Sequence, residues 1–401
     1  MELAERSSAT RLRPASVLAV AVVAAIIALG LYVSKLPTDG RLLGFSVWSG
    51  AVLGVVLQRS RFCFFCVTRD YLDHRDASGL IGILIALFVG LIGYYVLFSS
   101  FLPLPQSGRL PPGAHIGPIS WVLAVGALVF GIGMAISGSC VSAHFYRLGE
   151  GALASPFALL GVILGFVLGF VTWNSLYLAT VQTAPVIWLP AHLGYGGSLV
   201  LQLAVLAGLM AYLLKTHRAK QNTEAPQSSK QAEIFPKLWQ GRWPTWVGGL
   251  LVAFIGTLAY FRIAPLGVTA EIGSVARTAA SGYSWFPIRL EGLDGFSGCL
   301  TVVKETLWSR NGLFVVSLVL GAWAAALQSR QFTPRRPTGT EVLRNLAGGV
   351  LLGWGSMVAL GCTMGTLLSG VMAGALSGWV FGVFCFAGIW LGWRVRQRFS
   401  G

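Results

Sequence analysis

Long apolar runs alternate with short polar stretches along most of the chain. The best runs approach or exceed the roughly 18 residues that mark a membrane-spanning helix. They are Ala15–Ser34, Ser78–Leu97, Ile119–Ile136, Ala152–Phe170, Ser198–Leu214, Val247–Tyr260, Asn311–Ala326, Leu346–Leu360 and Leu376–Leu391, with a shorter one at Leu43–Leu57. The pattern predicts an all-α polytopic membrane protein with about ten spans.

The basic residues lie between the apolar runs. Of 401 residues, 29 are Lys or Arg and only 14 are Asp or Glu. The Lys and Arg residues cluster at Arg6–Arg13, Arg59–Arg75, Lys215–Lys237, Arg330–Arg344 and Arg394–Arg398. Because positive charge in short loops marks the cytoplasmic side, both termini are predicted to be cytoplasmic. The charges are spread over loops rather than over one polar face, which argues against a nucleic-acid partner and for a chain embedded in the lipid bilayer.

Counting spans against the basic loops predicts four parts. Residues 1–42 hold an N-terminal first helix, 43–215 are repeat one of a transport domain, 216–243 are a flexible cytoplasmic linker, and 244–401 are repeat two. Repeat one begins outside the membrane and repeat two inside, so the two are expected to be inverted. The stretch 267–308 is too polar to cross as one helix, which predicts a re-entrant segment next to a buried or wet site.

Two segments with the same spacing mark a candidate central site. One reads Gly131-x-Gly133 and ends on Cys140, and the other reads Gly353-x-Gly355 and ends on Cys362. Matching Gly-rich interruptions in two halves of a hydrophobic chain point to a transporter's binding site. Small neighbours, including Gly138 and Gly361, let backbone N–H groups approach a ligand, and a following helix start favours an anion. A thiol adds a weak donor on a soft atom, so the predicted ligand is a small sulfur-containing anion.

Other residues are candidates for this site, and each also has an ordinary structural interpretation. Cys63 follows the first short helix of repeat one, and Cys299 is its expected counterpart in repeat two, although both fit ordinary packing. Arg147 would draw anions toward the cytoplasmic loops, or form a loop ion pair with Glu150. Cys385 lies in a plain apolar run and is predicted to be a packing residue.

The pair Cys63-Phe-Phe-Cys66 leaves more than one interpretation open. A C-x-x-C spacing suits a redox dithiol or half of a zinc site. Zinc is disfavoured because no second C-x-x-C and no His pair at ligand spacing exist, so neither metal nor cofactor is predicted. The remaining interpretations are one substrate-path thiol beside a packing cysteine, packing alone, or a membrane thiol–disulfide oxidoreductase that uses Cys63 and Cys66. The first is preferred, which predicts a transporter rather than an enzyme.

At this point the motifs resemble the YeeE/YedE family of sulfur-compound transport membrane proteins. Four stretches carry the resemblance: Gly54-x-x-x-Gln58-Arg59-Ser60-Arg61-Phe62-Cys63, Gly138-x-Cys140 with Tyr146-Arg147-x-Gly149-Glu150-Gly151, Pro265-Leu266-Gly267-Val268-Thr269, and Gly361-Cys362-Thr363-x-Gly365. The resemblance implies a thiosulfate importer of the bacterial inner membrane, hourglass-shaped, with short helices and loops that bring cysteines to a constriction.

The resemblance also implies a path. Thiosulfate would pass without covalent capture between the thiols of Cys63, Cys140 and Cys362. From the residues themselves, we expect the anion to meet Cys299 and Cys362 from outside and then Cys140 and Cys63, before the cytoplasmic arginines draw it on. Another sulfur or selenium species is the alternative substrate. A small cytoplasmic sulfur-carrier protein is a candidate partner for the basic face.

Overall fold

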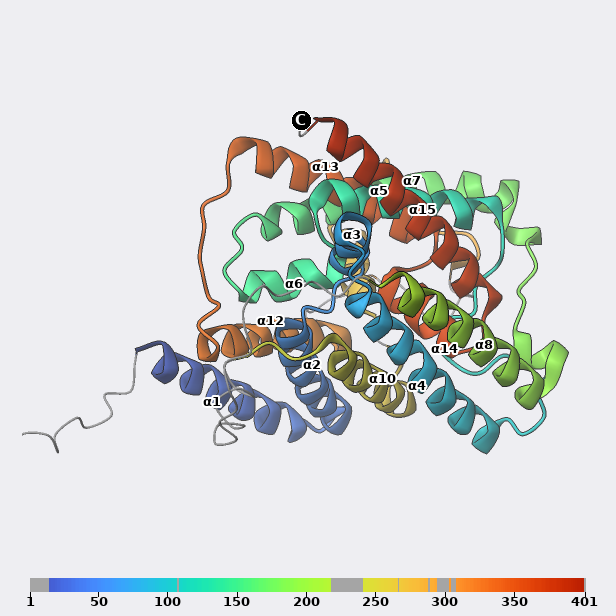
Figure 1. The fold of residues 1–401 in the computed structure, drawn as a ribbon, viewed down its shortest axis with the longest axis horizontal. Coiled ribbons are helices and arrows are strands. Elements are labelled where there is room, and N and C mark those ends of the chain that lie inside the picture. The colour runs from blue at the N-terminus through green and yellow to red at the C-terminus, as the bar shows by residue number, and fades with distance from the viewer. Residues whose placement is uncertain are drawn as a thin grey trace, which may run out of the picture.

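The computed structural model describes residues 14–106, 108–217, 241–265, 267–287, 289–293, 303 and 308–399. These residues form a helical assembly (Figure 1). In chain order the helices are α1 Pro14–Ser34, α2 Gly40–Ser60, α3 Phe64–His74, α4 Ser78–Phe101, α5 Trp121–Ser137, α6 Val141–Gly149, α7 Ser155–Ala179, η1 Val181–Thr183, α8 Leu189–Thr216, α10 Thr245–Arg262, α11 Val268–Ala280, α12 Arg310–Gln328, α13 Gly339–Val358, η3 Thr363–Ser369, α14 Gly370–Met372 and α15 Leu376–Phe399.

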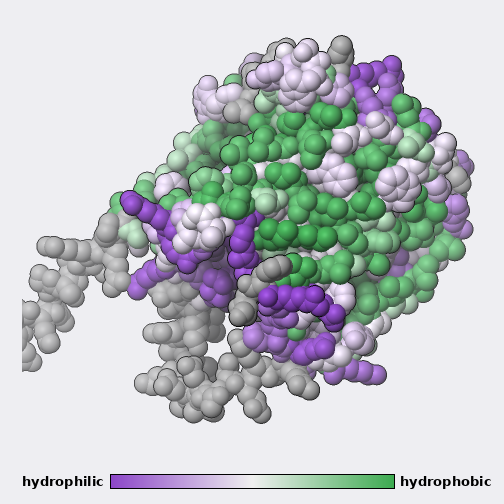
Figure 2. Space-filling model, turned by 90° about the horizontal axis from the view of Figure 1, so that it is seen from above, coloured by the Kyte–Doolittle hydropathy of each residue, from purple (hydrophilic) through white to green (hydrophobic). Residues whose placement is uncertain are grey.

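The predicted all-α membrane class is confirmed. Within the described residues, nine helices are long and apolar enough to cross a membrane. A tenth span results if α13 and the following η3 and α14, bent by 44° from it, count as one. Figure 2 shows a broad hydrophobic face whose hydrophilic residues gather toward its margins, as expected of a surface in contact with lipid. The inversion of the two halves and the hourglass shape stay predictions.

A long–short–long succession of helices recurs four times in the described chain. The short members are α3, α6, α11, and the η3–α14 pair. The segment around α3 was expected to be a charged loop, but residues 64–74 form a helix. Its charges lie on one side, while Phe64, Phe65 and Val67 are buried, so α3 is amphipathic and its apolar face fixes it in the interior.

Helices from the two halves of the chain pack against each other. The closest pairs are α2 with α12, α4 with α10, α5 with both α13 and α15, and α7 with α13. Glycines make these approaches possible: an added Cβ at Gly54 would overlap the Leu318 carbonyl, and one at Gly353 would overlap the Val162 carbonyl. Because the lipid bilayer provides no hydrophobic driving force between helices, membrane helices associate through such close contacts of small residues.

The glycines of the two matching segments belong to the same interfaces. A Cβ at Gly131 would overlap the Cys385 carbonyl, and a Cβ at Gly355 would lie 2.7 Å from the Gly126 carbonyl. These glycines therefore hold α5 against α15 and α13, rather than lining a ligand path with their backbones. The cysteines that follow them lie beyond the helix ends.

Helix α1 forms an outer layer of the assembly (Figure 1). It packs on α2 and α12 through a separate hydrophobic cluster that includes Val22, Ile26 and Val33. Most of its remaining side chains are exposed, as expected for a helix that faces lipid on its outer side.

Candidate functional site

Three of the four predicted cysteines occupy the same structural position. Cys63, Cys140 and Cys362 are the N-cap residues of α3, α6 and η3. Their exposed fractions are 0%, 1% and 1%, and none uses its side chain to cap its helix. The fourth, Cys299, lies outside the described residues. By helix order the matching position at the start of α11 is Gly267.

A short break in the helix precedes each cysteine. Helix α5 ends at Gly138, whose φ of 80° lies in the left-handed region that glycine adopts without strain. Before Cys362, an added Cβ at Gly361 would overlap the Thr366 hydroxyl oxygen, so only glycine fits without rearrangement. Helix α2 also ends at a residue in the left-handed region, but here the residue is Arg61, at a φ of 48°. The two candidate glycines thus shape the loops that present the thiols.

Helices α3 and α6 lie near the centre of the molecule in Figure 1. Three thiols at the starts of these helices come together. The Cys63 thiol is within hydrogen-bonding reach of the thiols of Cys140 and Cys66, and also of the Cys140 backbone N–H. Cys63 and Cys140 come from helix pairs that are far apart in the sequence. We call Cys63, Cys66 and Cys140 the thiol cluster.

The side chain of Arg147 closes one side of the thiol cluster. Its Nη2 donates to the Cys66 Sγ at 3.2 Å, and its Nη1 donates to the Gly138 carbonyl at 3.3 Å. Within the part of the chain that the structure describes, no ion pair joins Arg147 to Glu150, and Glu150 instead accepts from the Gln58 amide at 3.2 Å. The guanidinium therefore faces sulfur and a carbonyl, not the carboxylate of the loop.

Cys362 lies in a different polar surrounding. Its sulfur is within hydrogen-bonding reach of the Thr269 hydroxyl and of the backbone N–H groups of Thr269, Met364 and Gly365. The first turns of two short helices, η3 and α11, therefore present N–H groups to one sulfur. Unpaired N–H groups at helix starts favour negative charge. Cys385, expected to be a packing residue, is buried and close enough to Cys362 to interact with it electrostatically.

Several buried polar atoms beside Cys140 lack a hydrogen-bond partner. These are the hydroxyls of Ser139 and Ser142 and both ring nitrogens of His144, and the same holds for the Ser356 hydroxyl on α13. Buried polar groups are nearly always paired, with protein or with water, so unpaired ones mark a place where a polar guest can bind. From the sequence, no role was predicted for these side chains. Three polar residues within six positions of an apolar stretch were the available signal.

An arginine-lined cavity of about 400 Å³ lies next to the thiol cluster. Arg61, Arg69 and Arg147 contribute positive charge to it, and Asp70, Asp76 and Glu150 contribute carboxylates. Ser60, Cys66, Val67, Ser78, Gly79, Tyr146, Ala152 and Thr245 complete the lining. Burial raises the pKa of Glu150, although the Arg61 guanidinium and the Gln58 amide oppose this.

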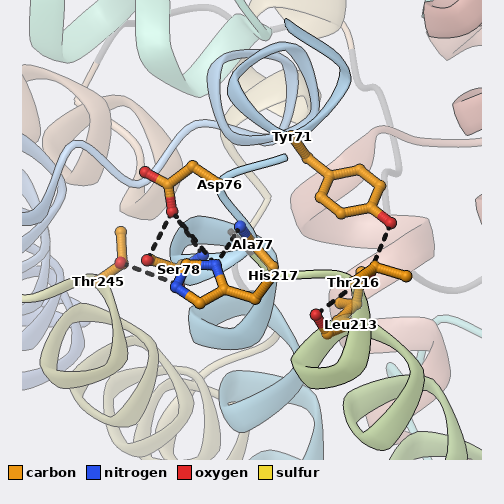
Figure 3. Close-up of polar contacts among 8 residues, drawn as sticks. All are labelled: Tyr71, Asp76, Ala77, Ser78, Leu213, Thr216, His217 and Thr245. Atoms are coloured by element: carbon orange, nitrogen blue, oxygen red, sulfur yellow. Dashed lines mark hydrogen bonds and ion pairs between the residues drawn. The ribbon is translucent and has the colours of Figure 1, made fainter. Parts of the chain in front are cut away.

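Figure 3 shows part of the cavity wall and the contacts that hold it. The Thr245 hydroxyl donates to the Ser78 carbonyl at 3.1 Å, which ties α10 to the start of α4. The Ala77 N–H donates to His217 Nδ1 at 3.1 Å, and the Tyr71 and Thr216 hydroxyls are 2.9 Å apart. Helices α3, α4, α8 and α10 are thereby fixed around one end of the cavity.

A smaller pocket borders the loop of Cys362. Its lining includes His115, Ser120, Leu360, Thr366 and Ser377. The connection between α4 and α5 folds back over it, since the Gly117 N–H donates to the Ser377 hydroxyl at 3.2 Å. Burial lowers the pKa of His115 to about 4, so this imidazole is neutral at physiological pH. In the described chain, no three His, Cys, Asp or Glu side chains group as metal ligands.

Comparison with known proteins shows relatives along nearly the whole chain. Residues 59–391 match a family model described as sulphur transport. The thiosulfate transporter TsuA of Escherichia coli K12 is 26% identical over 365 residues, 87% of this chain and 93% of that protein. The protein of the same name from Spirochaeta thermophila is 28% identical over 374 residues, 88% of this chain and 100% of its own. The probable transporter YedE of Salmonella typhimurium is 28% identical over 85 residues, 21% of each chain.

Proposed function

This chain belongs to the sulphur transport family, and we propose that it imports a small sulfur-containing anion, in the first place thiosulfate, across the bacterial inner membrane. The names of the two long-matching relatives support thiosulfate as the substrate. The basic connections between spans support an orientation with both termini and the arginine-lined cavity on the cytoplasmic side. Basic residues at that face would also suit docking of a small sulfur-carrier protein that removes the anion.

The observation that carries the proposal is the shared position of Cys63, Cys140 and Cys362 at the starts of three short helices. Each sulfur has a backbone N–H donor near it; Cys63 and Cys140 also have neighbouring thiols, and Cys362 has the Thr269 hydroxyl. This combination offers hydrogen bonds to the oxygens of a sulfur oxyanion and soft S–H contacts to its terminal sulfur. A phosphate or an alkali cation would gain nothing from the thiols.

The mechanism we propose is a passage by weak, successive contacts. The anion reaches Cys362 from the outer side, moves to the thiol cluster, and leaves through the arginine-lined cavity. Each contact is weak because conduction requires sites that release as readily as they bind. No bond to sulfur forms or breaks, so the path needs neither oxidant nor reductant. Inverted halves and an hourglass-shaped constriction would place these stations in this order.

A second candidate function has one observation in its favour. The thiols of Cys63 and Cys66 are in contact, as a dithiol of a membrane thiol–disulfide oxidoreductase must be. The same Cys63 thiol also contacts Cys140, which extends the arrangement beyond a simple C-x-x-C pair and favours a path for a guest. The two functions differ in which cysteine they need.

Growth and uptake measurements separate them. A sulfate-assimilation mutant that carries this chain should grow on thiosulfate as sole sulfur source, and labelled thiosulfate should enter proteoliposomes that contain it. We expect Cys362→Ala to lower uptake by at least about tenfold, the effect of about 1.4 kcal/mol at a single station. Cys385→Ala, a buried cysteine that begins no short helix, is the matched control and should keep most activity.

The opposite pattern would support the oxidoreductase. In that case Cys66→Ala would abolish activity while Cys362→Ala would leave it intact. Growth that does not depend on the chain would overturn thiosulfate import altogether.

A further inference from the structure

We propose that Cys66 and Arg147 form an additional anion-binding station, through which the sulfur anion leaves the thiol cluster for the arginine-lined cavity. The station deepens the proposed function and rests on it. Its ligand class is a sulfur oxyanion with a terminal sulfur, such as thiosulfate. Cys66 does not begin a short helix, so the path described above gives it no role.

Exposure distinguishes Cys66 from the cysteines at the helix starts. Cys63, Cys140 and Cys362 are 0–1% exposed, whereas Cys66 is only partly buried and lines the cavity. It is the third residue of α3, one turn after Cys63, and the two thiols are in contact. An anion that leaves Cys63 therefore meets the Cys66 sulfur on the way to the cavity.

The guanidinium supplies the second half of the station. Arg147 Nη2 is 3.2 Å from the Cys66 sulfur, and its Nη1 is held by the Gly138 carbonyl at 3.3 Å. The side chain is thus fixed in place by the loop that ends α5. A guanidinium carries five donors in a rigid plane and suits oxyanions, whereas a thiol suits sulfur. Together they match the two chemically different ends of thiosulfate.

The surrounding charges leave Arg147 as the cation best placed to hold an anion. Arg69, on the same cavity wall, is 2.7 Å from the Asp70 carboxylate and is largely neutralised by it. Asp76 is 3.9 Å from His217 and lies at the wall shown in Figure 3. Glu150 accepts from Gln58 instead of from Arg147. In the described residues, Arg147 is the cavity arginine that contacts a thiol directly.

Chemical labelling of Cys66 tests the station in the full-length protein. The probes are two methanethiosulfonate reagents, one carrying a sulfonate and one carrying a trimethylammonium group, applied to inside-out vesicles. We expect the sulfonate reagent to react faster with Cys66, by on the order of tenfold, because Arg147 attracts anions. Thiosulfate should slow this labelling more than sulfate does. Cys66→Ala gives the background from the buried cysteines.

Two variants of the arginine are the matched pair. Arg147→Lys keeps the positive charge and should keep the preference for the sulfonate reagent, whereas Arg147→Gln should remove it. Retention of labelling by the lysine variant shows that the fold survives substitution here. Cys66→Ser should raise the KM for thiosulfate several-fold with a smaller change in maximal rate, which a purely structural role for Cys66 would not produce.

The outcomes separate this station from the function on which it rests. If the unmodified chain transports thiosulfate but Cys66 reacts equally with both reagents and thiosulfate gives no protection, the station is wrong and the transport function stands. If thiosulfate protects Cys66 but no uptake occurs, the station is supported and import is overturned.

Discussion

At the scale of single residues, the candidate site depends on side chains that are small or soft. The glycines before Cys140 and Cys362 allow the chain to turn, so the thiols lie at helix starts where backbone N–H groups point to them. Gly138 uses a positive φ, while Gly361 uses the lack of a Cβ next to Thr366. Glycine therefore serves two different physical needs in the two loops.

Replacing Gly361 by Ala should lower stability and uptake together. The new Cβ would overlap the Thr366 hydroxyl, and such overpacking costs typically about 1–3 kcal/mol. We expect a lower melting temperature in detergent and a loss of thiosulfate uptake. Gly339→Ala is the control, since a Cβ at Gly339 has no neighbour within 4 Å. Removing the hydroxyl-bearing side chain in Gly361→Ala/Thr366→Ala should restore part of the stability; equal melting of all variants would contradict the close approach.

At the scale of elements, the short helices hold the candidate site residues, and the long helices make most of the contacts between helices. The long helices meet through glycines, as α13 does with α7 and α2 with α12. The short helices α3 and α6 are held in the interior by buried apolar residues and present their N-cap cysteines there. Because the positions of the short helices follow from the packing of the long ones, a fault in a long-helix interface should disturb the site.

A pair of glycine substitutions tests this dependence on packing. Gly353→Ala would push its Cβ into the Val162 carbonyl between α13 and α7, so we expect a clear loss of stability and uptake. Gly208→Ala in α8 meets nothing within 4 Å and should stabilise the helix by up to about 1 kcal/mol, as alanine does relative to glycine. Thermal unfolding in detergent measures both. Equal behaviour of the two variants would show that α13 and α7 are not closely packed.

At the scale of the whole molecule, charge is collected at the arginine-lined cavity. The positive charges of Arg61, Arg147 and Arg242 are near enough to act on the Glu150 carboxylate without an ion pair between Arg147 and Glu150, and Tyr146 lies near it. An anion that leaves through this cavity is attracted by the arginines and repelled by any ionised carboxylate. The ionisation of Glu150 therefore sets part of the field that the anion meets.

Acidification on the cavity side should increase thiosulfate transport, because it protonates Glu150. Its pKa is raised by burial, so the carboxylate takes up a proton at a higher pH than an exposed one. As pH falls through this raised pKa, one negative charge disappears and anion binding improves; above it the charge is present and binding weakens. Uptake into proteoliposomes at different pH values on the cavity side measures this. Glu150→Gln should flatten that dependence, and a dependence that the substitution leaves unchanged would contradict the assignment.

The sequence by itself determined the class of the protein and its family. Apolar runs of spanning length predicted an all-α membrane protein, because each lipid-exposed span must satisfy its backbone within a helix. The matching Gly-x-Gly and cysteine spacings made Cys140 and Cys362 equivalent, and the structure places both at starts of short helices. These properties follow from the order of residues along the chain, which can be read without the tertiary structure.

Only the tertiary structure decided which residues meet. It turned the expected basic loop after α2 into helix α3, brought Cys63 and Cys66 against Cys140, and directed Arg147 to sulfur rather than to Glu150. It also placed Thr269 at Cys362 and left His144 buried without a partner. Such contacts join residues many positions apart, and they depend on how glycine-lined helices pack rather than on any local signal.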